Sequence, residues 1–169
     1  WAGSAMICPE FRELWAGIEG AESIVFNPHK WLGAQFDCSI QFLKDPGAQV
    51  RTLGLRPTYL ETAGREEIVN FNEWTVPLGR RFRALKLWFV LRAYGLEGLR
   101  ERIRNHVLWA LRARDELAAL RGVRIVTEPR LSLFSFALET DAATEVLLQR
   151  INDDGRIYLT QTKVDGRFA

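Results

Sequence analysis

Two short runs of β-branched and aromatic residues, 23–26 and 39–43, constrain the possible folds most strongly. The Asn27-Pro28 pair interrupts the first run, and Asp45-Pro46-Gly47 ends the second. Apolar runs of this length, bounded by Pro, Gly and Asx residues, are typical of strands. The sequence therefore predicts two buried strands that are separated by a turn.

The rest of the chain predicts helices packed on a small, mostly antiparallel sheet that follows the remnant of a larger α/β sheet. Apolar residues at helical spacing favour two helices, and a bend at Tyr94-Gly95 should separate them. The other predicted elements are a short helix beginning at Pro9, a long loop over about 47–76, strands within 123–127 and 131–138, a helix capped by Thr140 or Asp141, and a strand over 156–160.

Charge and composition exclude several classes of partner. The 23 basic and 21 acidic side chains leave a net charge of +2, so we expect neither nucleic acid nor a membrane as a partner. Cys8 and Cys38 lack metal-ligand spacing, which favours reduced thiols, a cytoplasmic location and no metal site. The chain opens on Trp1 and stops at Ala169 without a closing element, so we expect a fragment of a longer protein.

The segment 26–32 carries the densest group of unusual residues, at the point where a predicted strand ends. A tight Asn-Pro turn fixes the backbone, and the following side chains can then project into a crevice at the strand ends. Lys30, between His29 and Trp31, can be partly desolvated there and lose its proton more readily, as imine formation requires. From the residues alone, an ordinary solvated lysine is an equally good interpretation.

A family resemblance favours the reactive lysine. Residues 27–32, Asn-Pro-His-Lys-Trp-Leu, with Phe-Asp-Cys-Ser at 36–39, resemble the cofactor-lysine segment of the aromatic-L-amino-acid decarboxylases. Residues 2–12, 56–60, 77–89 and 147–152 resemble further segments of that family in the same order. The resemblance thus covers nearly the whole chain.

The resemblance implies an α/β fold, the fold-type-I architecture of pyridoxal-phosphate-dependent transferases. Residues 1–85 should complete the large cofactor-binding domain, with the mobile catalytic loop at about 47–76. Residues 86–169 should form most of the small C-terminal α+β domain. The family's active unit is a homodimer, its cofactor is pyridoxal 5'-phosphate, and its substrate is a small-molecule amino acid.

The resemblance also assigns cofactor-binding residues. Lys30 should form the imine with pyridoxal phosphate and become a free base when substrate displaces it. Asn27 should contact the cofactor phosphate, although its side chain could merely start the turn. His29 should help to hold phosphate or substrate, or is simply packed. Gly79 and Arg80 match a segment that the partner subunit brings near the cofactor.

On the substrate side, Tyr59 in the long loop should donate a proton during catalysis. Phe36 should line the aromatic substrate pocket, although a phenylalanine in such a run is more often part of a core. His106 lies among Arg and Asn in a helical pattern, which favours an ordinary surface role.

Other functions remain open at this stage. An aldehyde synthase of the same family is one alternative, but such enzymes typically lack the loop tyrosine. A decarboxylase for histidine or glutamate is another, although His29 and Trp31 fit the aromatic branch better. Because the family's cofactor-binding Asp and stacking His are not in these residues, a truncated remnant that serves only folding or dimerisation is a third. We expect the fragment alone to be inactive, and the preferred aromatic substrate stays open.

Overall fold

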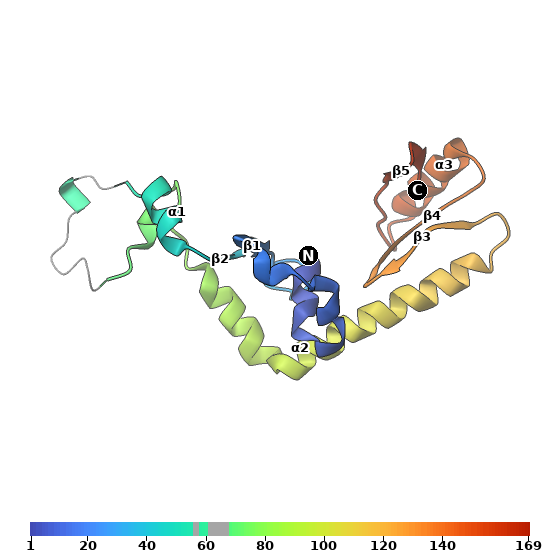
Figure 1. Cartoon of the computed structure of the whole chain (residues 1–169). Helices are drawn as coiled ribbons and strands as arrows, with labels where there is room; N and C mark the ends of the chain where they lie inside the picture. Colours follow the sequence, from blue (N-terminus) through green and yellow to red (C-terminus); the bar gives the residue numbers. More distant parts are fainter. Residues whose placement is uncertain (56–57, 61–67) are drawn as a thin grey trace. The chain divides into compact units, whose positions relative to one another are not determined.

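A computed structural model describes residues 1–55, 58–60 and 68–169 of the chain (Figure 1). These residues divide into two compact units, Trp1–Arg100 and Glu101–Ala169. The long helix α2 (Arg83–Ala118) contributes to both units. The domain boundary expected at residue 85 also falls within α2, and it remains a prediction.

The first unit begins with three 3-10 helices, η1 (Ala2–Ile7), η2 (Pro9–Trp15) and η3 (Ile18–Gly20). Pro9 lies at the first position of η2, where a missing amide proton costs nothing. Gly17 adopts the left-handed conformation (φ 92°) that separates η2 from η3. The predicted short helix from Pro9 is therefore confirmed, with 3-10 rather than α geometry.

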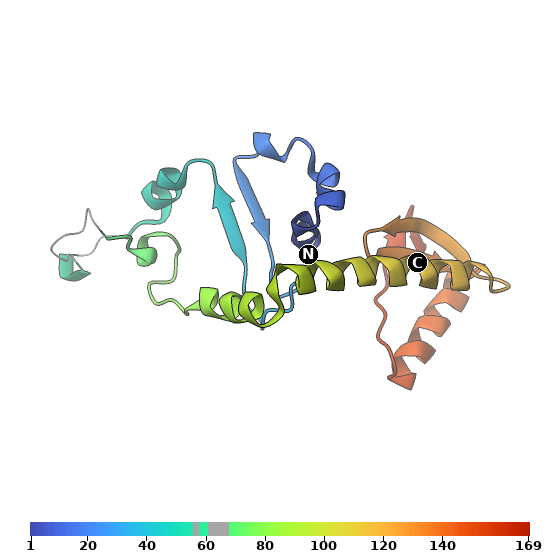
Figure 2. The same ribbon diagram turned by 90° about the horizontal axis from the view of Figure 1, so that it is seen from below.

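The two predicted strands exist and pair with each other. β1 (Ser23–Phe26) lies antiparallel to β2 (Ile40–Leu43), side by side in Figure 2. The expectation that both are buried is wrong for the described chain, because Val25 and Phe42 are 59% and 57% exposed. An apolar run shows that a strand has apolar faces, but it does not supply the elements that cover them.

The predicted loop over about 47–76 is partly helical, which corrects the sequence interpretation. α1 (Pro46–Leu53) begins where Asp-Pro-Gly was expected only to stop a strand. Asp45 Oδ1 accepts a hydrogen bond from Ala48 N at 3.2 Å and caps the helix, while Pro46 occupies its first turn. The short 3-10 helices η4 (Thr58–Leu60) and η6 (Phe71–Glu73) follow, whereas residues 56–57 and 61–67 of the predicted loop lie outside the described residues.

The predicted bend at Tyr94-Gly95 is confirmed within α2. Gly95 has φ 65° and ψ 174°, a backbone conformation that a residue with a Cβ rarely adopts. On the two sides of this bend, α2 continues as regular helix. Leu99, Ile103 and Ala110 are buried, as their helical spacing predicts.

The second unit contains the antiparallel pair β3 (Arg124–Arg130) and β4 (Leu133–Ala137), followed by α3 (Asp141–Asp154). Thr140 Oγ1 accepts from Ala143 N at 3.2 Å and caps α3, so these predicted elements are confirmed. Two-residue strands β5 (Lys163–Val164) and β6 (Arg167–Phe168) form a separate antiparallel pair.

The strand predicted over 156–160 is wrong, and one side chain explains why. Asn152 Nδ2 donates to Leu159 O at 3.0 Å, and Leu159 N donates to Asn152 Oδ1 at 2.8 Å. The amide therefore satisfies both backbone groups that a neighbouring strand would otherwise pair with. The segment after α3 is fixed by a side chain from that helix.

We expect replacement of Asn152 by Leu to lower the free energy of unfolding of the whole protein by about 1–3 kcal/mol, because the two backbone groups of Leu159 lose their partners. Asn152→Asp keeps the acceptor but loses the donor, and its loss should be smaller than that of Asn152→Leu. The exposed Asp153 on the same helix provides the control variant Asp153→Ala. Denaturant unfolding measures all three variants; equal stability of wild type and Asn152→Leu would contradict the assigned role.

Candidate functional site

Three backbone hydrogen bonds within residues 27–34 hold the turn after β1. Asn27 O accepts from Lys30 N at 3.0 Å, Lys30 O from Gly33 N at 3.2 Å, and Pro28 O from Ala34 N at 3.1 Å. Pro28, which pre-sets φ for a turn, is fully buried. The backbone that carries Lys30 therefore has a defined path between β1 and the segment leading to β2.

Lys30 is exposed, whereas Trp31 and Leu32, the next two residues, are buried. The Trp31 ring packs on Trp1 with 4.8 Å between ring centroids. The expected partial desolvation of Lys30 is thus not found, because its apolar neighbours turn inward and leave its side chain outside. Among the described residues, no hydrogen bond or ion pair engages the Lys30 amine, so it is available to react.

His29 is clamped by the backbone of Cys38. Its Nδ1 lies 3.0 Å from Cys38 N and 2.8 Å from Cys38 O, and the His29 amide donates to the same carbonyl at 3.3 Å. The ring can accept from the Cys38 amide or, when Nδ1 carries a proton, donate to the carbonyl. Phe36 meets the imidazole edge-on at 4.9 Å and is itself 78% exposed, so it is not part of a core here.

Asn27 is paired with Ser39, which lies across the turn. Ser39 Oγ donates to Asn27 Oδ1 at 2.7 Å. The amide nitrogen of Asn27 has no hydrogen-bond acceptor among the described residues. The turn therefore presents two nitrogen groups with unused donor capacity, the Lys30 amine and the Asn27 amide, three residues apart in the chain.

A second set of contacts ties the segment before β2 to the start of α2. Arg83 Nε donates to Asp37 Oδ2 at 3.0 Å, and Lys86 Nζ donates to Asp37 O at 2.8 Å. The Arg83 hydrogen bond, aided by the charges of Arg83 and Lys86, holds the pKa of the Asp37 carboxyl below its ordinary value. Cys38 Sγ also approaches Arg83 O at 3.8 Å. These contacts fix the chain just beyond the lysine turn.

We expect Arg83→Gln to raise the pKa of Asp37 toward its ordinary value, because the charged hydrogen-bond donor is lost. A depressed carboxyl pKa stabilises the folded state at pH values above the ordinary pKa, and this contribution disappears as the pH falls through the folded-state pKa. Arg83→Gln should reduce that acid-side dependence, and the part due to Lys86 should remain. NMR titration of the Asp37 carboxyl carbon measures the effect directly.

Asp45 is the internal control for this titration. A hydrogen bond from Arg51 and the Ala48 amide also lower the pKa of its carboxyl, without any contribution from Arg83. Its titration should therefore be the same in wild type and Arg83→Gln. An unchanged Asp37 midpoint in the variant would show that Arg83 is not the cause.

No hydrogen bond, ion pair or ring contact between described residues joins the other predicted site residues to this turn. Tyr59 lies in η4 with its side chain 77% exposed. Gly79 is exposed, and a Cβ built on it would meet nothing within 4 Å. Arg80 donates to Phe71 O at 3.0 Å and lies 5.8 Å over the Phe71 ring. The structure therefore brings Asn27, His29, Lys30 and Phe36 into one segment and leaves the loop residues apart.

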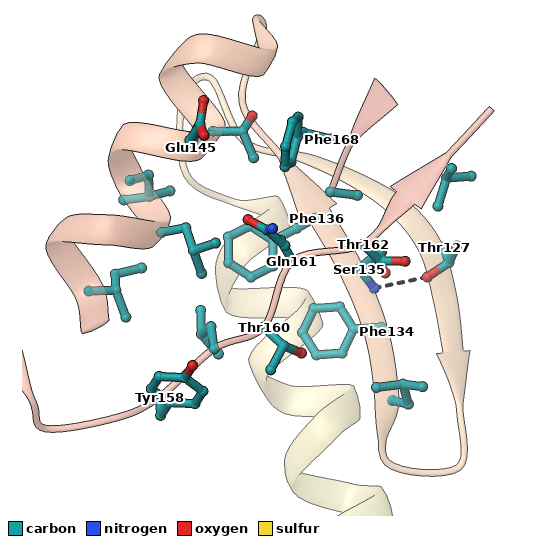
Figure 3. Close-up of a pocket in the computed structure, with 18 of the residues that line it drawn as sticks. Thr127, Phe134, Ser135, Phe136, Glu145, Tyr158, Thr160, Gln161, Thr162 and Phe168 are labelled. Carbon is teal, nitrogen blue, oxygen red and sulfur yellow. Dashed lines mark hydrogen bonds between the residues drawn. The ribbon is translucent and has the colours of Figure 1, made fainter. Parts of the chain in front are cut away.

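A cavity of about 710 Å³ lies in the second unit, between β4, α3 and the segment that follows α3 (Figure 3). Phe134, Phe136 and Phe168 contribute aromatic rings to it, and Ser135 N donates to Thr127 Oγ1 at 2.8 Å in its wall. None of the predicted site residues lines it, and its lining contains no lysine, histidine or cysteine. It offers no group for imine chemistry.

In the described part of the chain, no group of three or more His, Cys, Asp or Glu side chains could hold a metal ion. Within the same residues, no helix is both long and apolar enough to span a membrane.

The family model for the pyridoxal-dependent decarboxylase conserved domain matches residues 1–139. The chain belongs to the pyridoxal-dependent decarboxylase family. It is 45% identical over 165 residues to aromatic-L-amino-acid decarboxylase of Drosophila melanogaster, covering 97% of the chain and 32% of that protein. The chain thus spans about a third of the length of most of the curated relatives it matches.

Two solved structures support the α/β fold. A structure of Oryza sativa TDC with PLP and tryptamine matches with a TM-score of 0.94 and 35% identity, covering 99% of this chain and 37% of that one. Rhodiola rosea 4-hydroxyphenylacetaldehyde synthase matches with a TM-score of 0.86 and 34% identity, covering 99% and 35%. The predicted fold class is confirmed.

The donor groups of the turn fit pyridoxal phosphate, the cofactor on which this decarboxylase family depends. Imine formation with the cofactor aldehyde needs a primary amine, which Lys30 supplies without a described partner. A phosphate needs hydrogen-bond donors, and the amide nitrogen of Asn27 is one. These residues can hold the aldehyde and the phosphate ends of the cofactor respectively.

The sequence pattern does not predict the residues that support the turn. Ser39 was part of the recognised motif but had no assigned role, and the Asp37–Arg83 contact was not foreseen at all. The role of Ser39 follows from the strand register. Phe26 pairs with Ile40, so the next residue on each side places Asn27 opposite Ser39. Nothing in the sequence pattern points to Arg83, which lies 46 residues beyond Asp37.

Proposed function

We propose that the whole protein decarboxylates an aromatic L-amino acid to the corresponding amine and carbon dioxide. The observation that carries the proposal is the exposed Lys30 amine on a fixed turn, beside Asn27 and His29, in a member of the pyridoxal-dependent decarboxylase family. The likeness to aromatic-L-amino-acid decarboxylases supports the aromatic class of substrate.

Lys30 holds the cofactor through its amine and becomes a free base when the substrate amine takes its place. Pyridoxal phosphate, when bound, accepts the electron pair that the departing carbon dioxide leaves behind. The backbone hydrogen bonds of the turn keep the lysine Cα fixed during this exchange, so the amine stays within reach. His29, held by Cys38, can hold the phosphate or the substrate.

Tyr59 supplies the proton to the α-carbon of the substrate after carbon dioxide has left. Its phenol is exposed in the described chain, and a long loop is the kind of element that closes over a substrate. Closure excludes water and oxygen while the proton is transferred. Phe36 contributes an exposed ring beside His29 and lines the aromatic end of the substrate pocket.

Aldehyde synthesis is the alternative reaction, because the chain is also similar to the Rhodiola rosea synthase. Such a reaction couples decarboxylation to oxidative deamination and therefore consumes oxygen. The family resemblance places a tyrosine at position 59 in decarboxylases and typically not in synthases. Tyr59 thus supports decarboxylation, and measurement of ammonia and peroxide separates the two reactions.

We also propose a homodimer in the cytoplasm. The first part of α2 exposes large apolar side chains, among them Trp88, Phe89 and Tyr94, and such patches mark contact surfaces. Gly79, shortly before α2, belongs in this proposal to the segment that approaches the partner's cofactor. Cys8 and Cys38 are buried thiols, in keeping with a reducing compartment. Sedimentation of the whole protein tests the dimer.

The test of the proposed function is an assay of the whole protein, loaded with pyridoxal phosphate, against dopa, 5-hydroxytryptophan, tryptophan, tyrosine, phenylalanine, histidine and glutamate. We expect equal amounts of amine and carbon dioxide from at least one aromatic substrate, with little turnover of glutamate. A clear preference for glutamate or histidine would contradict the aromatic assignment. Release of aldehyde with ammonia and peroxide as main products would favour the synthase.

A further inference from the structure

The Asn27–Ser39 pair continues the strand ladder beyond its last backbone pair. β1 and β2 pair in the register Ser23↔Leu43 to Phe26↔Ile40, and one further step brings Asn27 opposite Ser39. Side chains directly opposite each other in an antiparallel pair lie on the same face and interact. The 2.7 Å hydrogen bond from Ser39 Oγ to Asn27 Oδ1 is therefore a cross-strand contact at the mouth of the lysine turn.

In this hydrogen bond the oxygen of the Asn27 amide faces Ser39. An amide has an acceptor end and a donor end, and a half-turn about its last side-chain bond exchanges them. The Ser39 hydroxyl occupies the oxygen, so the two N–H bonds of the nitrogen are left for another acceptor. An anion at the turn would be attracted by that nitrogen and repelled by the carbonyl oxygen.

We propose that Ser39 is a positioning residue that presents the Asn27 amide nitrogen to the phosphate of the cofactor. The inference rests on the proposed function, because it takes the phosphate to lie at this end of the turn. Ser39 acts through Asn27 and not on the reacting atoms. Without the Ser39 hydroxyl, the Asn27 amide loses its preferred orientation. The phosphate then loses a hydrogen-bond donor that is already oriented toward it.

The experiment compares two ligands of the apoprotein, pyridoxal phosphate and pyridoxal, which differ only in the phosphate. In the whole protein, Ser39→Ala should weaken the binding of pyridoxal phosphate by about five- to tenfold, the worth of one partly exposed hydrogen bond, and leave that of pyridoxal unchanged. Ser39→Thr keeps the hydroxyl and should restore the affinity. Absorbance titration of the apoprotein gives both dissociation constants.

Ser23 supplies the matched control. It lies on β1 in the same ladder, and its Oγ accepts from Gln41 Nε2 at 3.1 Å in another exposed cross-strand pair. Ser23→Ala should bind both ligands as the wild type does. Equal weakening of pyridoxal phosphate and pyridoxal by Ser39→Ala would indicate a general structural defect and overturn the inference, as would unchanged affinity for pyridoxal phosphate.

A double-mutant cycle tests the route through Asn27. Ser39→Ala should have no further effect on the affinity for pyridoxal phosphate once Asn27 is replaced by Ala, since the residue it orients is gone. Additive losses would show that Ser39 acts independently and would overturn the positioning role. Cofactor binding without decarboxylation would contradict the proposed function instead, because these constants do not depend on turnover.

Discussion

Replacing Lys30 by Ala in the whole protein should abolish covalent attachment of pyridoxal phosphate. It should also slow decarboxylation by about two to four orders of magnitude. Lys30 is the exposed amine on the fixed β1 turn, and alanine leaves the turn's backbone hydrogen bonds intact. The fold should therefore survive while the visible absorbance of the cofactor imine disappears. Absorbance spectra and amine formation, measured on the same preparation, report the two effects.

Lys44 is the matched control for this variant. It is an exposed lysine just after β2, and its Nζ lies 3.3 Å from Glu22 Oε1 in an exposed ion pair of small energetic value. Lys44→Ala should retain both the imine absorbance and the activity. Persistence of the absorbance in Lys30→Ala would mean that another amine holds the cofactor.

Tyr59→Phe should slow amine formation by about two to four orders of magnitude, the usual contribution of a positioned acid. The phenylalanine ring keeps the shape of the side chain but cannot donate a proton. Binding of the substrate should survive. The α-carbon that has lost carbon dioxide should then stay unprotonated and react with oxygen. Aldehyde, ammonia and peroxide should replace much of the amine, and their yield should fall when oxygen is removed.

Tyr158 provides the control for the loss of a phenol. It is 78% exposed in the second unit, close to the exposure of Tyr59, and no catalytic role is assigned to it. Tyr158→Phe should leave both the rate and the product ratio unchanged. If Tyr59→Phe also gives amine at the normal rate, Tyr59 is not the proton donor and the decarboxylase assignment loses its support from the loop.

Local sequence patterns predict much of the fold. The β-branched runs of β1 and β2, the Gly95 bend in α2 and the Thr140 cap of α3 all act over a few residues, and the structure confirms them. The lysine turn is similarly local, since Asn27, Pro28 and Lys30 are adjacent in the chain. Its role was nevertheless taken from a family resemblance, because an exposed lysine alone has no distinctive chemistry.

The errors came from side chains that replace backbone partners and from long-range contacts. Asp45 caps a helix where its Asp-Pro-Gly segment was interpreted as a stop, and Asn152 binds both backbone groups of a segment predicted as a strand. The contact of Arg83 with Asp37 depends on how α2 packs, which no local pattern records. The exposure of Lys30 likewise depends on a distant contact, because Trp31 packs on Trp1.

The most direct test of the central claim is to identify the residue that carries the cofactor in the wild-type protein. Borohydride reduction of the protein loaded with pyridoxal phosphate fixes the cofactor to its lysine, and peptide mapping by mass spectrometry then locates it. We predict a single modified peptide that contains Lys30. Modification at Lys44, Lys86 or Lys163, or no modification at all, would contradict the assignment of the β1 turn as the cofactor site.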